Sequence, residues 1–335
     1  MIPENTASKT SSSTIVVPVY NELQNIELLY QEIKSAMDGS GRSYDILFVD
    51  DGSTDGSVAA LRDLAVNHQE VKVILLRRNF GQTAAMHAGI QTAQGDYIVT
   101  MDGDLQNDPR DIPAMLDKLD EGMDLVFGWR KNRQDNLFSR KLPSYLANKL
   151  ISSVTGFPIQ DLGCTLKAIK SEIAKEIELY GEMHRFIPIL ASNLGARSVE
   201  MVVNHRARKY GESKYGLGRS VRVILDLITI QYMSKYFDSP MKLFGFVGLI
   251  VSMLAVASTT AVVIMKLFWQ FDVTGNPITL LAVLSTILAV QFFILGIIGE
   301  LSVRIYYGSG EKRSFHIRER LNFKATESST GPNLS

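Results

Sequence analysis

Three acidic residues follow one apolar segment of the chain, and their spacing suits the binding of a divalent cation. The segment YIVTM leads directly into Asp102, Gly103 and Asp104, and Asp108 follows four residues later. Charged side chains at the end of a buried strand cost free energy unless they are paired, hydrated or bound to a metal. Two carboxylates two residues apart can hold Mg²⁺ or Mn²⁺, which complete their ligand shell with phosphate oxygens and water. The same pattern also occurs in solvated loops, so the choice between a metal site and a solvated loop depends on the surrounding elements.

The elements that would position these acids alternate between strand and helix from about residue 14 to 213. Predicted strands cover residues 14–20, 44–51, 71–77, 96–102 and 123–129, and predicted helices cover 22–37, 55–68 and 81–93. This order indicates an α/β fold with a mostly parallel sheet and helices on both faces. Ligands of such sheets gather at the carboxyl ends of the strands. Asp51, Asp102, Asp104 and Arg130 all follow strand ends, so we expect them to line one crevice.

The composition excludes several classes of protein. The 335 residues include 35 basic and 35 acidic ones, and this balance argues against a nucleic-acid-binding protein. No glycine-rich dinucleotide motif follows the first strand, and no Walker A motif is present, which disfavours dehydrogenases and P-loop enzymes. The single cysteine, Cys164, precludes an intrachain disulfide. Cys164 and His87 are expected to be structural, because neither shows the spacing of metal ligands.

Two charge-free segments, residues 243–265 and 278–299, are each longer than the ~20 apolar residues that cross a bilayer as a helix. A buried hairpin of a soluble protein is the alternative, but two such segments joined by a short linker favour a membrane hairpin. Basic residues flank both outer ends, which places both termini and the preceding domain in the cytoplasm. The polar first residues show no signal peptide.

These features divide the chain into five parts. We expect a disordered tail at 1–13, a catalytic domain at 14–215, interfacial juxtamembrane helices at 216–240, two transmembrane helices at 241–308 and a cytoplasmic tail at 309–335. Gly248 and Ser252 form a small-xxx-small pair that permits close packing of helices, which is compatible with a homo-oligomer.

Five motifs occur in the order found in one enzyme family: IVVPVYNE, FVDDGSTD, MDGDLQNDP, DLGCTLKA and RKYGESKY. The chain resembles family 2 glycosyltransferases of the Rossmann-like GT-A fold over residues 14–214. More closely, it is similar to polyisoprenyl-phosphate glycosyltransferases, which include dolichol-phosphate mannosyltransferases and bacterial bactoprenol glucosyltransferases. The two C-terminal spans match the bacterial members, which implies an integral protein of the bacterial inner membrane.

The resemblance assigns roles to individual residues. Contact with the nucleotide sugar is implied for Pro18, Tyr20, Glu22, Asp51, Asp102 and Arg130. The metal and diphosphate site is implied for Asp102, Asp104 and Gln106, and an acid near the donor sugar and metal for Asp161. Arg208 and Lys214 match a mobile loop that reaches the diphosphate, and Arg140, Ser144 and Arg130 match the site of the acceptor phosphate. The resemblance thus implies four catalytic residues: Asp104, Asp161, Arg208 and Lys214. Arg130 follows FGW where the family usually has GSR, so the resemblance covers the arginine and not the residues before it.

Several of these residues have simpler alternative roles. Asp51 caps a helix or turn as readily as it binds a base, and both roles are compatible. Pro18 and Tyr20 also suit a turn. Arg208 and Lys214 also suit a solvated basic strip near anionic lipid.

The resulting hypothesis is a metal-dependent, inverting hexosyltransferase that uses Mg²⁺ or Mn²⁺. It would move glucose from UDP-glucose to undecaprenyl phosphate at the cytoplasmic face of the membrane. A GDP-mannose-dependent polyprenyl-phosphate mannosyltransferase and an inactive, membrane-anchored scaffold are the alternatives. A processive polysaccharide synthase is disfavoured, because the chain has no Q-x-x-R-W motif and few spans.

Overall fold

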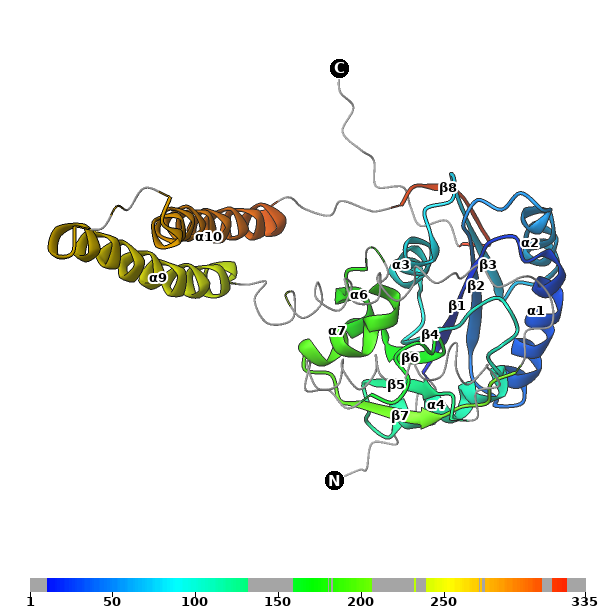
Figure 1. Ribbon diagram of the computed structural model, residues 1–335. Coiled ribbons are helices and arrows are strands. Elements are labelled where there is room, and N and C mark those ends of the chain that lie inside the picture. Colours follow the sequence, from blue (N-terminus) through cyan, green and yellow to red (C-terminus); the bar gives the residue numbers. More distant parts are fainter. Residues whose placement is uncertain are drawn as a thin grey trace, which may run out of the picture. The chain divides into compact units, whose positions relative to one another are not determined.

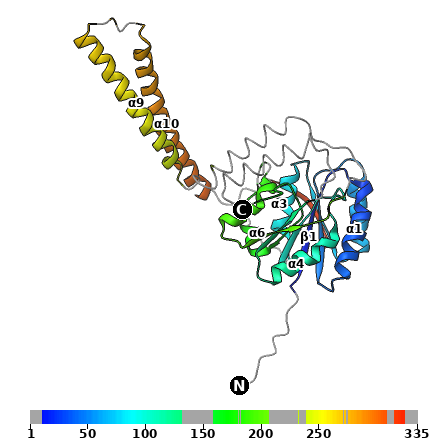
Figure 2. The ribbon, with the colours of Figure 1, turned by 60° about the horizontal axis from the view of Figure 1, so that its bottom comes forward.

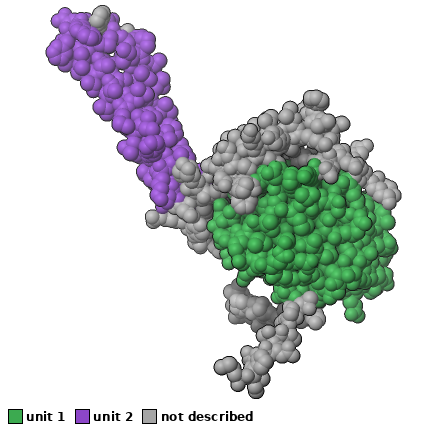
Figure 3. All heavy atoms as spheres, turned by 90° about the horizontal axis from the view of Figure 1, so that it is seen from below, with its two compact units in different colours: residues 1–226, 313–335 green, residues 227–312 purple. Residues whose placement is uncertain are grey.

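The structure is a computed structural model, and it describes residues 11–131, 159–179, 181, 183–206, 232, 239–270, 272, 275–308 and 315–323. The chain divides into two compact units, which Figure 3 shows in different colours. The first unit combines residues from 1–226 with residues from 313–335, and the second comprises 227–312. The second unit is therefore inserted, in sequence, between two parts of the first.

The described residues of the first unit form an eight-stranded sheet in the order β7-β5-β6-β4-β1-β2-β3-β8 (Figure 1). The strands are β1 (Ser13–Val19), β2 (Tyr44–Asp50), β3 (Val71–Leu76), β4 (Tyr97–Thr100), β5 (Leu125–Trp129), β6 (Lys167–Lys170), β7 (Ser198–Val202) and β8 (Ile317–Leu321). β6 runs antiparallel to β4 and β5, and β8 runs antiparallel to β3, whereas the other neighbours are parallel. The predicted α/β fold with a mostly parallel sheet is confirmed.

Helices cover both faces of this sheet (Figures 1 and 2). The helices are α1 (Leu23–Asp38), α2 (Ser57–Asn67), α3 (Gln82–Thr92), α4 (Ile112–Asp120), α6 (Ser171–Glu176) and α7 (Ile187–Asn193), with 3-10 turns at Pro109–Asp111 and Met183–Phe186. Side chains of α1, α2 and α4 form one core cluster with the strands. α3 packs on the opposite face, where Gly89 lies directly against Val16 and Val49.

The sequence pattern explains why these elements form. In α1, Ile26, Leu29, Ile33 and Met37 recur at helical spacing, and each is at most 2% exposed. Every residue of β1 is buried, as expected for a parallel strand that is covered on both faces. The continuous apolar strands therefore lie in the centre of the sheet, and their carboxyl ends form the edge where the acidic residues follow.

Strand β8 differs from the expectation of a C-terminal tail at 309–335. Ile317–Leu321 pairs with β3, and Glu319 forms a two-pronged ion pair with Arg62 of α2. The side-chain amide of Asn322 donates to three backbone carbonyls, those of Ala65, His68 and Val71. This part of the predicted tail is thus a component of the α/β unit. It was missed because five residues with three charges do not show the pattern of a buried strand.

The second unit consists of α9 (Pro240–Phe268) and α10 (Pro277–Gly308). Both are long and apolar enough to cross a membrane. Only 17% and 22% of their most apolar stretches are buried inside the structure, so most of the apolar side chains are exposed. This low burial argues against core helices of a soluble protein.

The two long helices pack against each other as an antiparallel pair. A Cβ at Gly248 would lie 3.3 Å from the Phe293 ring, and one at Gly296 would lie 2.6 Å from the Met241 sulfur. Gly248 therefore permits close packing of the two helices against each other.

Candidate functional site

The carboxyl ends of β2 and β4 bring the predicted acids to the same edge of the sheet. Both strands run parallel to β1, which lies between them, and Asp51 and Asp102 follow their last residues. Asp51 is 3% exposed, so its charge has to be satisfied by the protein itself.

Asp51 fixes the loop that follows β3. Its Oδ1 accepts the backbone N–H of Phe80 at 2.7 Å, and its Oδ2 accepts that of Gly81 at 2.8 Å. Burial raises the pKa of Asp51, and these two N–H groups partly oppose the shift. Asp51 thus connects the ends of β2 and β3, and its carboxylate does not cap α2, the helix that follows it in the chain. Each carboxylate oxygen has a second lone pair, so Asp51 can accept a further hydrogen bond from a ligand.

Gln82 continues this connection from the 77–82 segment to the next acid. Its side-chain amide Nε2 donates to Oδ1 of Asp102 at 2.6 Å. The loop that Asp51 holds by its backbone therefore also orients Asp102 by a side chain. Gln82 has no signal in the sequence other than its position directly after Gly81, at the start of α3.

Asp102 and Asp104 form a pair of neighbouring carboxylates. Burial and the charge of Asp104 together raise the pKa of Asp102 to about 6, against an opposing hydrogen bond from Thr165. The backbone N–H of Gln106 donates to Oδ1 of Asp104 at 3.2 Å. Mutual repulsion of two partly buried carboxylates is the electrostatic condition that a divalent cation relieves.

The backbone around this pair is tightly constrained. A Cβ at Gly103 would lie 3.2 Å from the carbonyl oxygen of Pro18 in β1, so a side chain is disfavoured there. Leu105 has a φ of 61°, a left-handed conformation that a non-glycine residue seldom adopts. Such strained residues concentrate at ligand-binding sites.

Arg130 and Asp161 form a two-pronged ion pair beside the acids. The Nε and Nη2 atoms of Arg130 donate to the two carboxylate oxygens of Asp161 at 2.6 and 2.9 Å. Both side chains are about one-tenth exposed. Burial disfavours the charged form of Arg130, but the hydrogen bonds and charge of Asp161 favour it more strongly, so the pKa of Arg130 is raised. The backbone N–H groups of Arg130 and Gly163 also donate to Asp161. Asp161 is therefore saturated with donors and is suited to holding Arg130 in place.

The third acid of the opening motif, Asp108, has a structural role. Its carboxylate binds the guanidinium groups of Arg110 and Arg206, both at 2.7 Å. Arg206 also donates its backbone N–H to the carbonyl of Gln106, and Asn107 pairs with His205 in a short bridge. These contacts attach the acidic motif to the chain just before the RKYGESKY segment.

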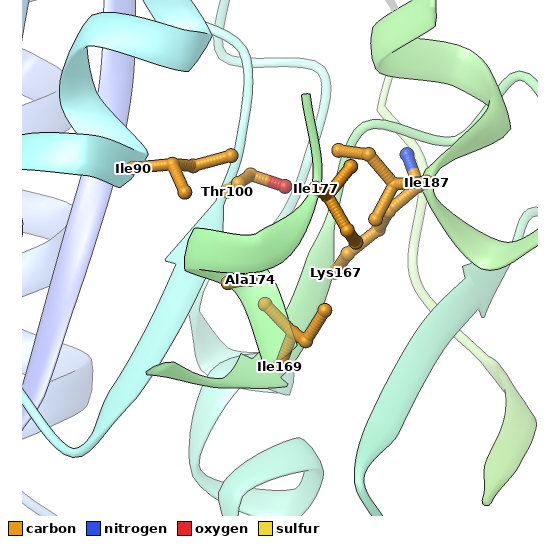
Figure 4. Close-up of a pocket in the computed structure, with 7 residues that line it drawn as sticks. All are labelled: Ile90, Thr100, Lys167, Ile169, Ala174, Ile177 and Ile187. Atoms are coloured by element: carbon orange, nitrogen blue, oxygen red, sulfur yellow. The ribbon is translucent and has the colours of Figure 1, made fainter. Parts of the chain in front are cut away.

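Lys167 is a buried lysine whose charge acts to lower the pKa of Asp102, and it was not identified from the sequence. It is 1% exposed, its ammonium donates to the carbonyl of Cys164, and burial lowers its pKa to about 8. Its stem borders a small cavity with Thr100 and apolar residues (Figure 4). The cavity lining comprises Ile90, Thr100, Lys167, Ile169, Ala174, Ile177 and Ile187. Its volume of about 10 Å³ is near the lower limit for one water molecule, so it is a packing gap and not a substrate site.

The remaining predicted residues are distributed as follows. Pro18 is buried within β1, and Tyr20 is half-buried directly after it. Glu22 precedes α1, where its carboxylate accepts from the Asn25 amide at 2.5 Å. Four further predicted site residues lie outside the described residues: Arg140, Ser144, Arg208 and Lys214.

The described residues fit a metal that relies on its substrate for ligands. Among them, no group of three or more histidine, cysteine, aspartate or glutamate side chains could hold a metal ion. Asp102 and Asp104 offer two carboxylates, which is the usual protein contribution to a Mg²⁺ or Mn²⁺ site completed by phosphate oxygens and water.

Comparison with known proteins relates the chain to one sequence family. Residues 14–178 match the family described as glycosyl transferase family 2. The chain is 41% identical over 310 residues to a dodecaprenyl-phosphate galacturonate synthase of Rhizobium johnstonii, covering 91% of this chain and 92% of the relative. It is 35% identical over 317 residues to an undecaprenyl-phosphate 4-deoxy-4-formamido-L-arabinose transferase of Aeromonas hydrophila, covering 94% and 95%.

Solved structures share the fold at lower identity. Glucosyl-3-phosphoglycerate synthase from Mycobacterium tuberculosis, in complex with Mn²⁺, UDP and phosphoglyceric acid, matches with a TM-score of 0.52 and 19% identity. The match covers 66% of this chain and 78% of that one. The same enzyme with Mn²⁺ and UDP-glucose matches with a TM-score of 0.51, at 66% and 79% coverage. These matches confirm the predicted GT-A fold.

Proposed function

This chain belongs to glycosyl transferase family 2, among the transferases that attach a sugar to polyprenyl phosphate, and from that premise we propose how its site acts. One sugar would pass from a nucleoside diphosphate to the phosphate of a polyprenyl lipid, with inversion at the anomeric carbon. The observation that carries the proposal is the convergence of Asp51, Asp102 and Asp104 at one edge of the sheet, where the 77–82 segment connects Asp51 to Asp102.

The donor sugar is proposed to be a uronic acid or a related modified sugar rather than glucose. The relatives that cover nearly the whole chain are named for galacturonate and for formamido-arabinose, and those names give no support to the expected glucose. Galacturonate takes precedence here because the galacturonate synthase is the more similar of these two relatives. UDP-glucose and GDP-mannose remain as the competitors in an assay.

A divalent cation is proposed to sit at Asp102 and Asp104. The support is the pair of adjacent carboxylates, the raised pKa of Asp102 and the Mn²⁺ bound with UDP in enzymes of the same fold. When bound, the cation supplies positive charge to the diphosphate leaving group. Asp102 is oriented for this role by Gln82, and Asp104 by the backbone N–H of Gln106.

The residues of this chain have separate tasks in the proposed reaction. Arg208 and Lys214 would stabilise the departing diphosphate, whereas Arg140 and Ser144 would bind the acceptor phosphate, both by resemblance to the family. Arg130 keeps guanidinium N–H groups beyond the two bound to Asp161, and these would orient a phosphate. The acceptor is a phosphomonoester, largely dianionic at neutral pH because its second pKa is about 6, so no general base is required. The donor-saturated Asp161 fits this scheme as a holder of Arg130.

Chain connectivity supports the proposed membrane topology. β1–β7 precede the two apolar helices and β8 follows them, and all eight strands belong to one sheet. If both helices cross the membrane, the start of α9 and the end of α10 would lie on the same side of it. With the basic flanks, this supports a cytoplasmic catalytic unit with two spans in the bacterial inner membrane.

Sugar transfer by the full-length protein tests the function. Wild-type protein with undecaprenyl phosphate and Mn²⁺ should transfer sugar from UDP-galacturonate in preference to UDP-glucose and GDP-mannose. Asp104→Asn should keep the fold and lose transfer by about 10²–10³-fold, as expected when a stabiliser of developing charge is removed. Asp117→Asn is the control, because Asp117 is an exposed carboxylate that pairs with Arg42. Transfer from none of the donors would refute the function, and full activity in excess chelator would refute the metal.

A further inference from the structure

The segment 315–323, which follows α10 in the chain and contains β8, contacts the loop that connects Asp51 to Asp102. The carbonyl of His316 accepts the backbone N–H of Arg77 at 3.0 Å. The His316 ring lies 6.0 Å from the Phe80 ring, measured between centroids, and the Arg78 guanidinium lies 4.4 Å from the same ring centre. Phe80 is thus packed between a residue of its own loop and a residue of the C-terminal segment.

The 77–82 segment is held from two further sides. Asp51 accepts its N–H groups at Phe80 and Gly81, and a Cβ at Gly52 would lie 2.6 Å from the Arg78 backbone. The segment ends at Gln82, which donates to Asp102. A displacement of this segment would therefore move donors to both acids at once.

The C-terminal segment is firmly attached to the α/β unit. Phe315 is 4% exposed and meets the His87 ring of α3 edge-on, at 5.7 Å between centroids. At its other end, Asn322 donates to three carbonyls at the end of α2 and the start of β3. The segment that carries His316 is therefore anchored at both ends, although the His316 side chain itself is exposed.

We propose that residues 315–323 hold the 77–82 segment in its nucleotide-binding geometry, with the His316 ring as the positioning residue. This inference rests on the proposed function, because it assigns the 77–82 segment to the nucleoside diphosphate part of the donor. His316 acts through Phe80 and Asp51, so its loss should weaken nucleotide binding and leave the acceptor site unaffected. A segment that follows α10 in the chain would then be required for a site whose acidic residues all precede α9.

The test compares His316→Ala, His316→Phe and Arg318→Ala in the full-length protein. Arg318 is the matched control, because it is an exposed residue two positions after His316, in β8. Titration with UDP in the presence of Mn²⁺ should show about three- to tenfold weaker binding for His316→Ala, the size expected for one aromatic contact. His316→Phe should restore binding to within twofold, and Arg318→Ala should match the wild type. The KM for undecaprenyl phosphate should be the same in all four proteins.

A second measurement keeps the inference separate from the proposed function. Amide hydrogen exchange at Phe80 and Gly81 should speed up in His316→Ala and in Asn322→Ala, with no ligand present. If wild-type protein binds neither UDP nor GDP, the proposed function fails, whatever the exchange shows. If wild type binds but His316→Ala binds equally well, or if His316→Phe fails to rescue it, the positioning role is refuted.

Discussion

Replacing Asp108 with asparagine should lower the free energy of unfolding of the α/β unit by about 2 kcal/mol. The Asp108 side chain is 1% exposed and binds Arg110 and Arg206. Burial alone would raise its pKa, but hydrogen bonds from Arg110 and Arg206 outweigh burial and lower the pKa from 3.8 to about 2. A shift of one pKa unit corresponds to about 1.4 kcal/mol, which gives a stabilisation by the charged form of roughly 2 kcal/mol at neutral pH.

The contribution of Asp108 to the free energy of unfolding should depend on pH. Because the pKa of Asp108 is lower in the folded protein than in the unfolded chain, its contribution is complete above about pH 4. It should disappear as the pH falls from about 4 to 2, where the carboxylate becomes protonated in the folded protein. Wild type and Asp108→Asn should therefore differ at pH 7 and converge near pH 2.

Urea unfolding of the full-length protein in detergent can measure the difference. The chain has two tryptophans, and a Trp269→Phe background leaves Trp129 of β5 as the reporter of the α/β unit. Arg110→Ala is the control, because the Arg110 side chain is 75% exposed and solvent screens its ion pair, so its loss should be below ~1 kcal/mol. An Asp108→Asn protein as stable as wild type at pH 7, or no more destabilised than Arg110→Ala, would contradict the assignment of a buried structural carboxylate.

Three further outcomes are expected. A cysteine at Asp272, between the two long helices, should react with a membrane-impermeant reagent only from the non-cytoplasmic side, and one at Arg318 only from the cytoplasm; reaction of both from one side would refute the two-span topology. Arg140→Ala should raise the acceptor KM about tenfold or more, as for a lost charge-assisted hydrogen bond, whereas Lys214→Ala should mainly lower kcat. If calorimetry shows equal losses of donor binding in both variants, the assignment of Arg140 to the acceptor and Lys214 to the donor is wrong. Gly103→Ala should lower transfer more than stability, because the new Cβ would press on the Pro18 carbonyl and displace the acids; unchanged transfer kinetics would show that the strand end tolerates the shift.

Burial of native Cys164 simplifies the labelling experiment. The residue is 1% exposed, and burial raises the pKa of its thiol to about 11. Thiolate is the reactive form, so the native residue should remain unlabelled in a folded background.

The sequence was sufficient to predict features that depend on local pattern. Alternating apolar segments predicted β1 to β5 and the helices α1, α2 and α3, whereas α4 was not predicted. The rule that ligands bind at strand ends placed Asp51, Asp102 and Asp104 together. The charge-free segments likewise predicted the two long helices, although α10 continues to Gly308, beyond its charge-free part.

Features that depend on distant partners could not be predicted in this way. The pairing of Arg130 with Asp161 links residues 31 positions apart, and no periodicity signals it. Asp108 looks the same in sequence as Asp104, and only its contact with Arg206 separates a structural acid from a candidate ligand. β8 was missed for the same reason, because its stability comes from the edge of β3 and from Arg62, not from its own composition.

The late position of β8 in the chain also constrains how the protein is made. Arg62 and its partner Glu319 are separated by 257 residues, so β3 leaves the ribosome long before the strand that covers it. At about 5–20 residues per second, the interval is roughly 12–50 s. During that time β3 has an open edge, a surface prone to pairing with other chains. Both apolar helices are synthesised within the same interval, so the edge of the catalytic sheet is closed only after the hairpin has had the opportunity to enter the membrane.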